Sequence, residues 1–222
     1  MKKSNNFSGC GRKLLLRQTC STLAAIMRVI LCILFLLVFQ CVSGQIPPIQ
    51  SNTSWKDSTT SFLVKVLNNQ YDFLLGYKIE SFWWSNTQVY KVLAYKNSHW
   101  QAIQIVSTKN KKDRVKTEIS KWNFSSDSAF KLINGLSALH FWTLDHDLLN
   151  QEGVPISDST VRKLQIADGV NYKFEILTKE GYRIIQSYEP ETYLKEFPKM
   201  TIRKIFIDGR ELFLNTWNNS RM

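Results

Sequence analysis

Cysteine is scarce in this chain and confined to one end of it. The four cysteines are Cys10, Cys20, Cys32 and Cys41, and all of them precede Gln45. Their spacing matches no zinc-binding pattern. A domain that begins at Gln45 therefore has no disulfide framework, no catalytic thiol and no cysteine-based metal site, and its stability must rest on a hydrophobic core.

Acidic residues are absent from the N-terminal part of the chain, where the first is Asp57. Six basic residues precede position 45 with no acid to offset them: Lys2, Lys3, Arg12, Lys13, Arg17 and Arg28. They account for six of the +11 net charges and leave +5 for the rest of the chain. The basic balance belongs largely to this leader, so it does not indicate nucleic-acid binding.

Long apolar runs are also missing, apart from VILCILFLLVF at residues 29–39. This run is shorter than the roughly 20 residues that a membrane-spanning helix needs. A basic start, a short apolar run and the small residues around Val42-Ser43-Gly44 are typical of a cleaved signal peptide. The sequence thus predicts export, with residues 1–44 as the leader and Gln45 as the first mature residue. Because Met27 directly precedes Arg28 and the run, we also hypothesise that translation starts at Met27.

Two alternatives to cleavage stay open. Residues 23–42 are long enough to span a membrane as an uncleaved anchor, with Arg28 near one end. Cys41 offers a thiol for lipid attachment, although Phe39 and Gln40 are larger than the residues that usually precede such a site. All three interpretations place the remaining chain outside the cytoplasm, as a periplasmic, secreted or membrane-anchored domain.

The rest of the chain predicts one domain behind a linker. Residues 45–60 contain Pro47, Pro48 and many Ser, Thr and Asn residues, which is typical of a flexible linker. Residues 61–222 show no repeat and no second linker, and they are enough for one domain with a real core. Residues 61–67 and 71–79 are apolar segments whose structure the pattern leaves undecided.

Strands and helices alternate in this domain. Residues 88–95 and 100–107 predict two strands paired across Lys96-Asn97-Ser98, and a further strand is expected at 115–119. Residues 126–140 predict a capped helix, residues 145–160 a loop, and residues 170–177 and 182–188 a hairpin. Residues 201–217 fit both a helix and a hairpin at Asp208-Gly209, and the three-turn apolar stripe favours the helix. We therefore predict a single α+β domain, an antiparallel sheet with two or three packed helices.

A short pattern resembles one found in uncharacterised bacterial exported proteins. It consists of Phe141-Trp142, Asp168-Gly169, Tyr172, Phe174-Glu175, Tyr182 and Pro190. In those proteins an aromatic segment leads to a DG turn, an aromatic strand with a glutamate, a return strand with a tyrosine, and a proline before a helix. The resemblance implies an α+β domain and a bacterial origin. It implies no activity and provides no catalytic residues to carry over.

Aromatic and basic clusters are the candidates for binding. Phe82, Trp83 and Trp84 are consecutive, so they cannot all face one side of a strand or helix. At least one of them is expected on the other side, either in second-layer packing or as an exposed contact for binding. Lys109, Lys111, Lys112, Arg114 and Lys116 form the one basic run, which is more typical of a solvated loop than of a site for an anionic polymer.

Catalytic and metal-binding patterns are weak. His140, Asp145, His146 and Asp147 are the only dense His/Asp cluster, and their spacing is not that of a metalloprotease helix. His99 beside Ser98 lacks the orienting acid and the oxyanion hole of a triad. Glu175 and Glu189 are the candidates for carboxylate chemistry on a glycan, while Glu191 is better explained by the start of a helix. We predict no metal and no cofactor.

The sequence therefore favours an exported, non-catalytic domain that binds a protein or a component of the cell envelope, with Phe82, Trp83 and Trp84 as the first candidates for the contact. An immunity or inhibitor protein is one form of this role. The alternatives are an envelope hydrolase that uses carboxylates and an uncleaved, membrane-tethered protein. No nucleic-acid partner is expected, and a membrane is expected to be involved only through an uncleaved or lipidated leader.

Overall fold

The computed structural model describes residues 46–52, 61–67, 70–81, 86–109, 115–157, 160–179 and 181–221. All of them belong to one unit, Ile46–Met222. The predicted leader, its apolar run and its four cysteines lie outside the described residues. No helix among the described residues is long and apolar enough to span a membrane.

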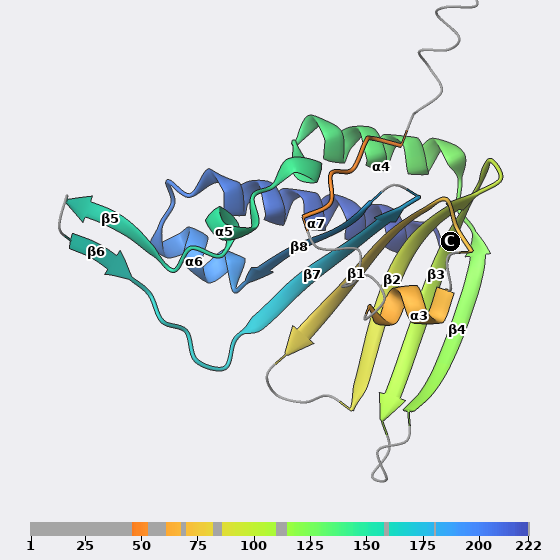
Figure 1. Cartoon of the computed structure of the whole chain (residues 1–222), viewed down its shortest axis with the longest axis horizontal. Helices are drawn as coiled ribbons and strands as arrows, with labels where there is room; N and C mark the ends of the chain where they lie inside the picture. Colours follow the sequence, from red (N-terminus) through yellow and green to blue (C-terminus); the bar gives the residue numbers. More distant parts are fainter. Residues whose placement is uncertain are drawn as a thin grey trace, which may run out of the picture. The chain divides into compact units, whose positions relative to one another are not determined.

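The domain is built on a six-stranded antiparallel sheet with the order β4-β3-β2-β1-β7-β8 (Figure 1). Four strands form a meander: β1 (Phe73–Ser81), β2 (Thr87–Lys96), β3 (His99–Lys109) and β4 (Val115–Asn123). The hairpin of β7 (Val170–Thr178) and β8 (Tyr182–Tyr188) adds to the other side of β1. Between β2 and β3, Asn97 and Ser98 have φ angles of 48° and 64°, as a tight two-residue hairpin turn requires.

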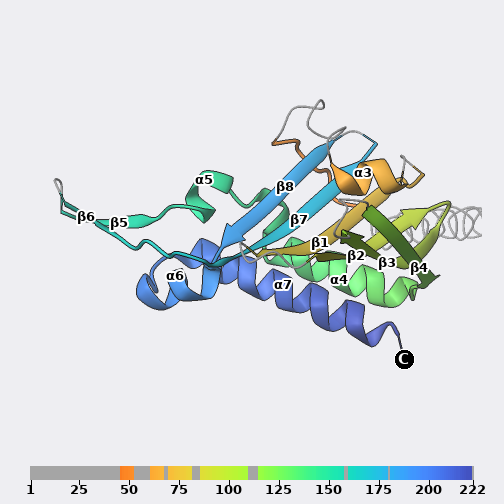
Figure 2. The ribbon, with the colours of Figure 1, turned by 90° about the horizontal axis from the view of Figure 1, so that it is seen from below.

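Two helices cover one face of the sheet. They are α4 (Ser126–Ala138) and α7 (Thr201–Asn219), which contact each other and lie on the same side of the sheet in Figure 2. Alternation along β1 directs Phe73, Leu75 and Tyr77 into this layer, where they join buried residues of both helices. The aromatic side chains therefore form the main core between the sheet and the long helices.

The opposite face carries only the short helix α3 (Phe62–Leu67) among the described residues. Leu63 and Leu67 of α3 pack against Leu74, Val92 and other residues that alternate to this face. Gly76 lets the helix approach the sheet closely, because a Cβ atom there would lie 2.7 Å from Leu63 Cδ2. Beyond α3, this face carries polar side chains together with the exposed apolar residues Val115 and Ile119 of β4.

Most of the predicted elements are confirmed. The α+β class, the antiparallel sheet, the two hairpins and the helix at 126–140 agree with the structure, and residues 201–217 are helical. Residues 61–67 and 71–79, left undecided, form α3 and most of β1. Within the described ranges the sheet packs with five α-helices, three of them with seven or more residues, so the expected two or three helices match the longer ones.

The predicted loop at 145–160 was wrong. This stretch contains α5 (His146–Leu149) and β5 (Gly153–Ser157), which pairs with β6 (Thr160–Lys163). Asp145 starts α5, because its Oδ1 accepts hydrogen bonds of 2.9 Å from the backbone amides of Asp147 and Leu148. Helix α6 (Pro190–Glu196) then precedes α7, with Pro190 in its first turn.

Residues 46–52, which we assigned to the linker, lie against the β8 edge. The Asn52 side chain donates to Ile184 O (2.6 Å) and accepts from Ile184 N (2.9 Å). Arg183 donates to the carbonyl groups of Gln50 (3.1 Å) and Leu144 (2.7 Å). The contacts of the domain thus begin before Ser61.

Candidate functional site

A groove of about 410 Å³ lies on the α3 face of the sheet. This volume is within the range of small-molecule sites, roughly 300–1,000 Å³. All six strands of the sheet and the start of α3 contribute to its wall. The lining residues are Ser61, Phe62, Lys78, Asn86, Gln88, Tyr90, Ser107, Lys109, Val115, Lys173, Glu175, Tyr182 and Ile184.

Strand alternation explains why this face is polar. Lys173 and Glu175 flank Phe174, whose side chain is fully buried in the main core, and Lys78 follows Tyr77 in the same way. Because successive side chains point to opposite faces, an apolar core on one face places these charges on the other. The central strands β1 and β7 therefore carry charged residues at their middle.

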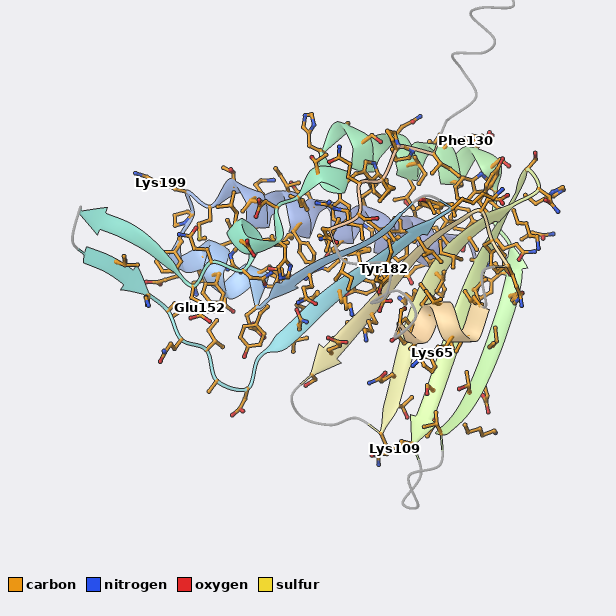
Figure 3. All side chains as sticks on the ribbon, viewed as in Figure 1. Lys65, Lys109, Phe130, Glu152, Tyr182 and Lys199 are labelled. Atoms are coloured by element: carbon orange, nitrogen blue, oxygen red, sulfur yellow. The ribbon has the colours of Figure 1, made fainter. Side chains whose placement is uncertain are left out.

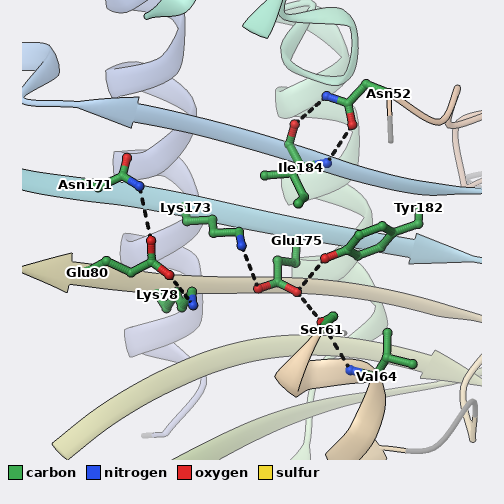
Figure 4. A network of polar contacts seen from close by, with 10 residues as sticks. All are labelled: Asn52, Ser61, Val64, Lys78, Glu80, Asn171, Lys173, Glu175, Tyr182 and Ile184. Atoms are coloured by element: carbon green, nitrogen blue, oxygen red, sulfur yellow. Dashed lines mark hydrogen bonds and ion pairs between the residues drawn. The ribbon is translucent and has the colours of Figure 1, made fainter. Parts of the chain in front are cut away.

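Glu175 is the centre of the polar network in Figure 4 and is only 2% exposed. Its carboxylate accepts a short hydrogen bond from Ser61 Oγ and one of 2.9 Å from Tyr182 Oη. Lys173 Nζ lies 3.4 Å from the other oxygen. Ser61 Oγ in turn accepts from Val64 N (3.4 Å), so the same hydroxyl caps α3. Glu175 thus fastens α3 to the sheet.

Lys78 and Glu80 form a second charged group, next to the network of Glu175. Its ammonium pairs with Glu80, which also accepts from Asn171 Nδ2 (3.2 Å), and it lies 5.1 Å from the centre of the Tyr90 ring. Burial alone would raise the pKa of Glu80, but the hydrogen bond and the charge of Lys78 hold this pKa below its ordinary value. Glu80 is therefore a stable carboxylate at neutral pH.

The aromatic part of the wall is rigid. The rings of Phe62 and Tyr90 stack with centroids 5.3 Å apart and an interplanar angle of 29°. Burial raises the pKa of the Tyr90 and Tyr182 hydroxyls, so both stay neutral at physiological pH. Lys109, the last residue of β3, also lines the groove, and Figure 3 shows it at the end of the strand. The lining combines three lysines, one glutamate and stacked aromatic rings.

The predicted binding residues Phe82, Trp83 and Trp84 lie outside the described residues, directly after the last residue of β1, Ser81. Of the basic run, Lys109 and Lys116 are described, and they take different positions. Lys109 lines the groove, whereas Lys116 pairs with Glu118 on the exposed strand β4 at 2.7 Å.

Only part of the His/Asp cluster comes together, because Asp145, His146 and Asp147 line a second pocket without His140. His140 lies between α4 and the following turn with a φ of 56°, while Asp145 caps α5 and His146 lies within that helix. The described residues contain no group of three or more His, Cys, Asp or Glu side chains that could hold a metal ion. His99 is exposed, and its ring nitrogen Nδ1 lies 2.6 Å from Asn97 O.

The two glutamates suggested for glycan hydrolysis are far apart. Glu175 pairs with Ile184 across the hairpin, and Glu189 lies five residues further along the chain. At about 3.3 Å per residue this places their Cα atoms roughly 16 Å apart, whereas the carboxyl groups of glycosidases lie about 5–9.5 Å apart. Glu189 also accepts hydrogen bonds from Val170 N (2.6 Å) and Thr192 Oγ1 (3.0 Å), while Glu191 pairs with Arg210.

Lys78, Lys173 and Tyr90 of the groove were not among the predicted site residues. A signal for two of them was present, since Tyr77-Lys78-Ile79 and Tyr172-Lys173-Phe174-Glu175 place lysines between apolar residues of strands. A charged residue in the middle of an otherwise apolar strand indicates a face that is not fully covered. Their meeting in one groove depends on the pairing of β1 with β7, which the pattern does not specify.

Comparisons with models of protein families, with curated proteins and with solved structures found no match for this chain. The functional argument therefore rests on the residues of the groove and on the sequence.

Proposed function

We propose that this protein is an exported, non-catalytic domain whose groove binds an anionic component of the cell envelope. The basic leader and the apolar run at 29–39 support export. The observation that carries the binding role is the set of lysines on the central strands, Lys78 and Lys173, which lie with Lys109 along one groove.

The geometry favours a ligand that carries carboxylate or phosphate groups. Lys78 and Lys173 keep side-chain exposures of 11% and 17%, so their ammonium groups are held in place and are poorly hydrated. Each has a carboxylate neighbour, Glu80 beside Lys78 and Glu175 beside Lys173. The stacked rings of Phe62 and Tyr90 supply a flat apolar surface beside these charges, which suits a sugar ring or an aliphatic part of the same ligand.

The network favours binding over catalysis. Glu175 accepts hydrogen bonds from two hydroxyl groups and faces an ammonium, so it is held as a structural carboxylate. The hydroxyl of Ser61 donates to Glu175 and accepts from Val64 N, so both of its contacts serve to cap α3 and to tie it to the sheet. The separation of Glu175 from Glu189 leaves the hydrolase alternative without a geometric argument.

The test is a binding titration of the purified full-length protein with polygalacturonate and polyphosphate, with uncharged dextran as the control ligand. We expect binding of at least one polyanion, with an affinity that decreases as salt increases. Lys78→Gln and Lys173→Gln should each weaken it several-fold. Lys204→Gln, which removes the same charge from α7 beyond the opposite face, is the matched control and should leave it unchanged.

Thermal melts of the same variants separate loss of binding from loss of fold. If neither polyanion binds, or if Lys204→Gln weakens binding as much as the groove variants, the proposed ligand class is wrong. A preference for polygalacturonate would indicate carboxylate ligands and a preference for polyphosphate would indicate phosphate ligands.

A further inference from the structure

The two edges of the sheet differ. On β8, side chains from other segments form hydrogen bonds to the outward-facing backbone groups. Ser51 Oγ accepts from Tyr182 N (3.0 Å), and Asn52 bonds to both backbone groups of Ile184. Asn150 donates to Gln186 O (3.0 Å). Side-chain hydrogen bonds at every second residue are what an outward-facing strand edge needs to be closed to further pairing. The β8 edge is therefore blocked.

The β4 edge is regular and open within the part of the chain that the structure describes. There β3 is the one strand paired with β4, and the register runs from Gln101↔Asn123 to Lys109↔Val115 without a bulge. Residues 115–121 are all exposed. A long, unbulged edge of this kind presents a row of backbone donors and acceptors to another strand.

The side chains of β4 form a self-complementary pattern. Val115 and Ile119 lie on the groove side and are 58% and 44% exposed. Lys116 and Glu118 alternate with them on the other side, with side-chain exposures of 78% and 65%. An antiparallel copy of this segment that crosses at Thr117 would place each Lys116 opposite a Glu118, and each Val115 opposite an Ile119.

We infer that β4 pairs with β4 of a second copy of this chain, antiparallel and centred on Thr117. Two cross-strand ion pairs and two β-branched pairs select this register, since opposite charges and apolar pairs facing each other stabilise a sheet. Lysines usually protect an edge strand from indiscriminate pairing. In β4, Lys116 and Glu118 attract a second copy in this register and repel strands that lack the complementary charges.

This arrangement brings the grooves of the two copies onto one face of a continuous sheet. Val115 belongs both to the groove lining and to the proposed interface, so each groove would border the junction between the copies. A polymer that carries repeated anionic groups could then occupy both grooves. The interface itself does not depend on the proposed ligand.

The experiment is sedimentation equilibrium of the purified full-length protein over a wide concentration range. Five paired residues per strand make a small interface, below about 1,200 Å², so we expect a dimer with a dissociation constant that is micromolar or weaker. Lys116→Glu alone and Glu118→Lys alone each set like charges opposite each other, and each should weaken the dimer about tenfold or more.

Mixing the two variants provides the decisive measurement. In a heterodimer of Lys116→Glu with Glu118→Lys, two acidic groups of one chain face two ammonium groups of the other, so the mixture should dimerise at least as well as the native chain. A chain that is monomeric throughout the range would overturn the inference. So would a dimer that neither single variant weakens, or one that is not restored in the mixture, since the contact would then lie elsewhere or in another register.

Discussion

Replacement of Glu175 by Gln tests whether this carboxylate holds α3 on the sheet. The native side chain accepts two charge-assisted hydrogen bonds, from Ser61 and Tyr182, and faces Lys173. Such bonds stabilise by about 1.5–3 kcal/mol each, against about 1 kcal/mol for neutral ones. The variant keeps the shape and loses the charge, so we expect a loss of about 2–3 kcal/mol in the free energy of unfolding.

Urea denaturation of the variant measures this loss through the shift of the midpoint at constant slope. Glu152→Gln is the matched control, because Glu152 is exposed, and it should change stability by less than about 0.5 kcal/mol. Hydrogen exchange locates the effect, since amides of α3 should lose protection while those of α7 keep theirs. A Glu175→Gln variant within about 0.5 kcal/mol of the native protein would refute the anchoring role.

Three further changes test the packing and the charges of the domain. Arg203→Ala should lower the free energy of unfolding, measured with urea, by about 3–5 kcal/mol. The residue is 1% exposed, and its guanidinium donates to two backbone carbonyls and lies over an aromatic ring. A loss below about 1 kcal/mol would contradict this role. Gly209→Ala should lower the stability of the domain by about 1–3 kcal/mol despite the better helix propensity of alanine, since the new Cβ would lie 2.3 Å from Phe141 Cδ2. Gly135→Ala is the comparison, because its Cβ would meet the end of a flexible leucine side chain, and it should lower stability clearly less in thermal melts. The pKa of Glu80 is lowered in the folded state, where its lysine partner outweighs the effect of burial. Its contribution to stability is therefore present above the unfolded pKa and is lost as pH falls through the lowered folded pKa. The urea midpoints of the native chain and Glu80→Gln should therefore converge as pH falls below 4.5, the ordinary pKa of a glutamate, and a constant gap would argue against the ion pair.

Local patterns in the sequence were enough to predict most secondary structure. The apolar stripe of residues 201–217 favours a helix, and α7 spans Thr201–Asn219. The alternation around Phe174 predicts a half-buried strand, and Phe174 is indeed in the core. These predictions succeed because helix and strand periods follow directly from backbone geometry. Short elements such as α5 and β5 were not predicted, because four or five residues show too little periodicity to be recognised.

Composition and local spacing were sufficient to predict the α+β class, the position of the cysteines and the basic charge of residues 1–44. The location of the candidate site depends on long-range contacts instead. Lys78 and Lys173 are distant in sequence, and they meet because β7 inserts beside β1 after a long connection. The open groove and the exposed β4 edge likewise depend on which face and which edge the helices and the N-terminal segment cover, and no local pattern specifies such long-range contacts.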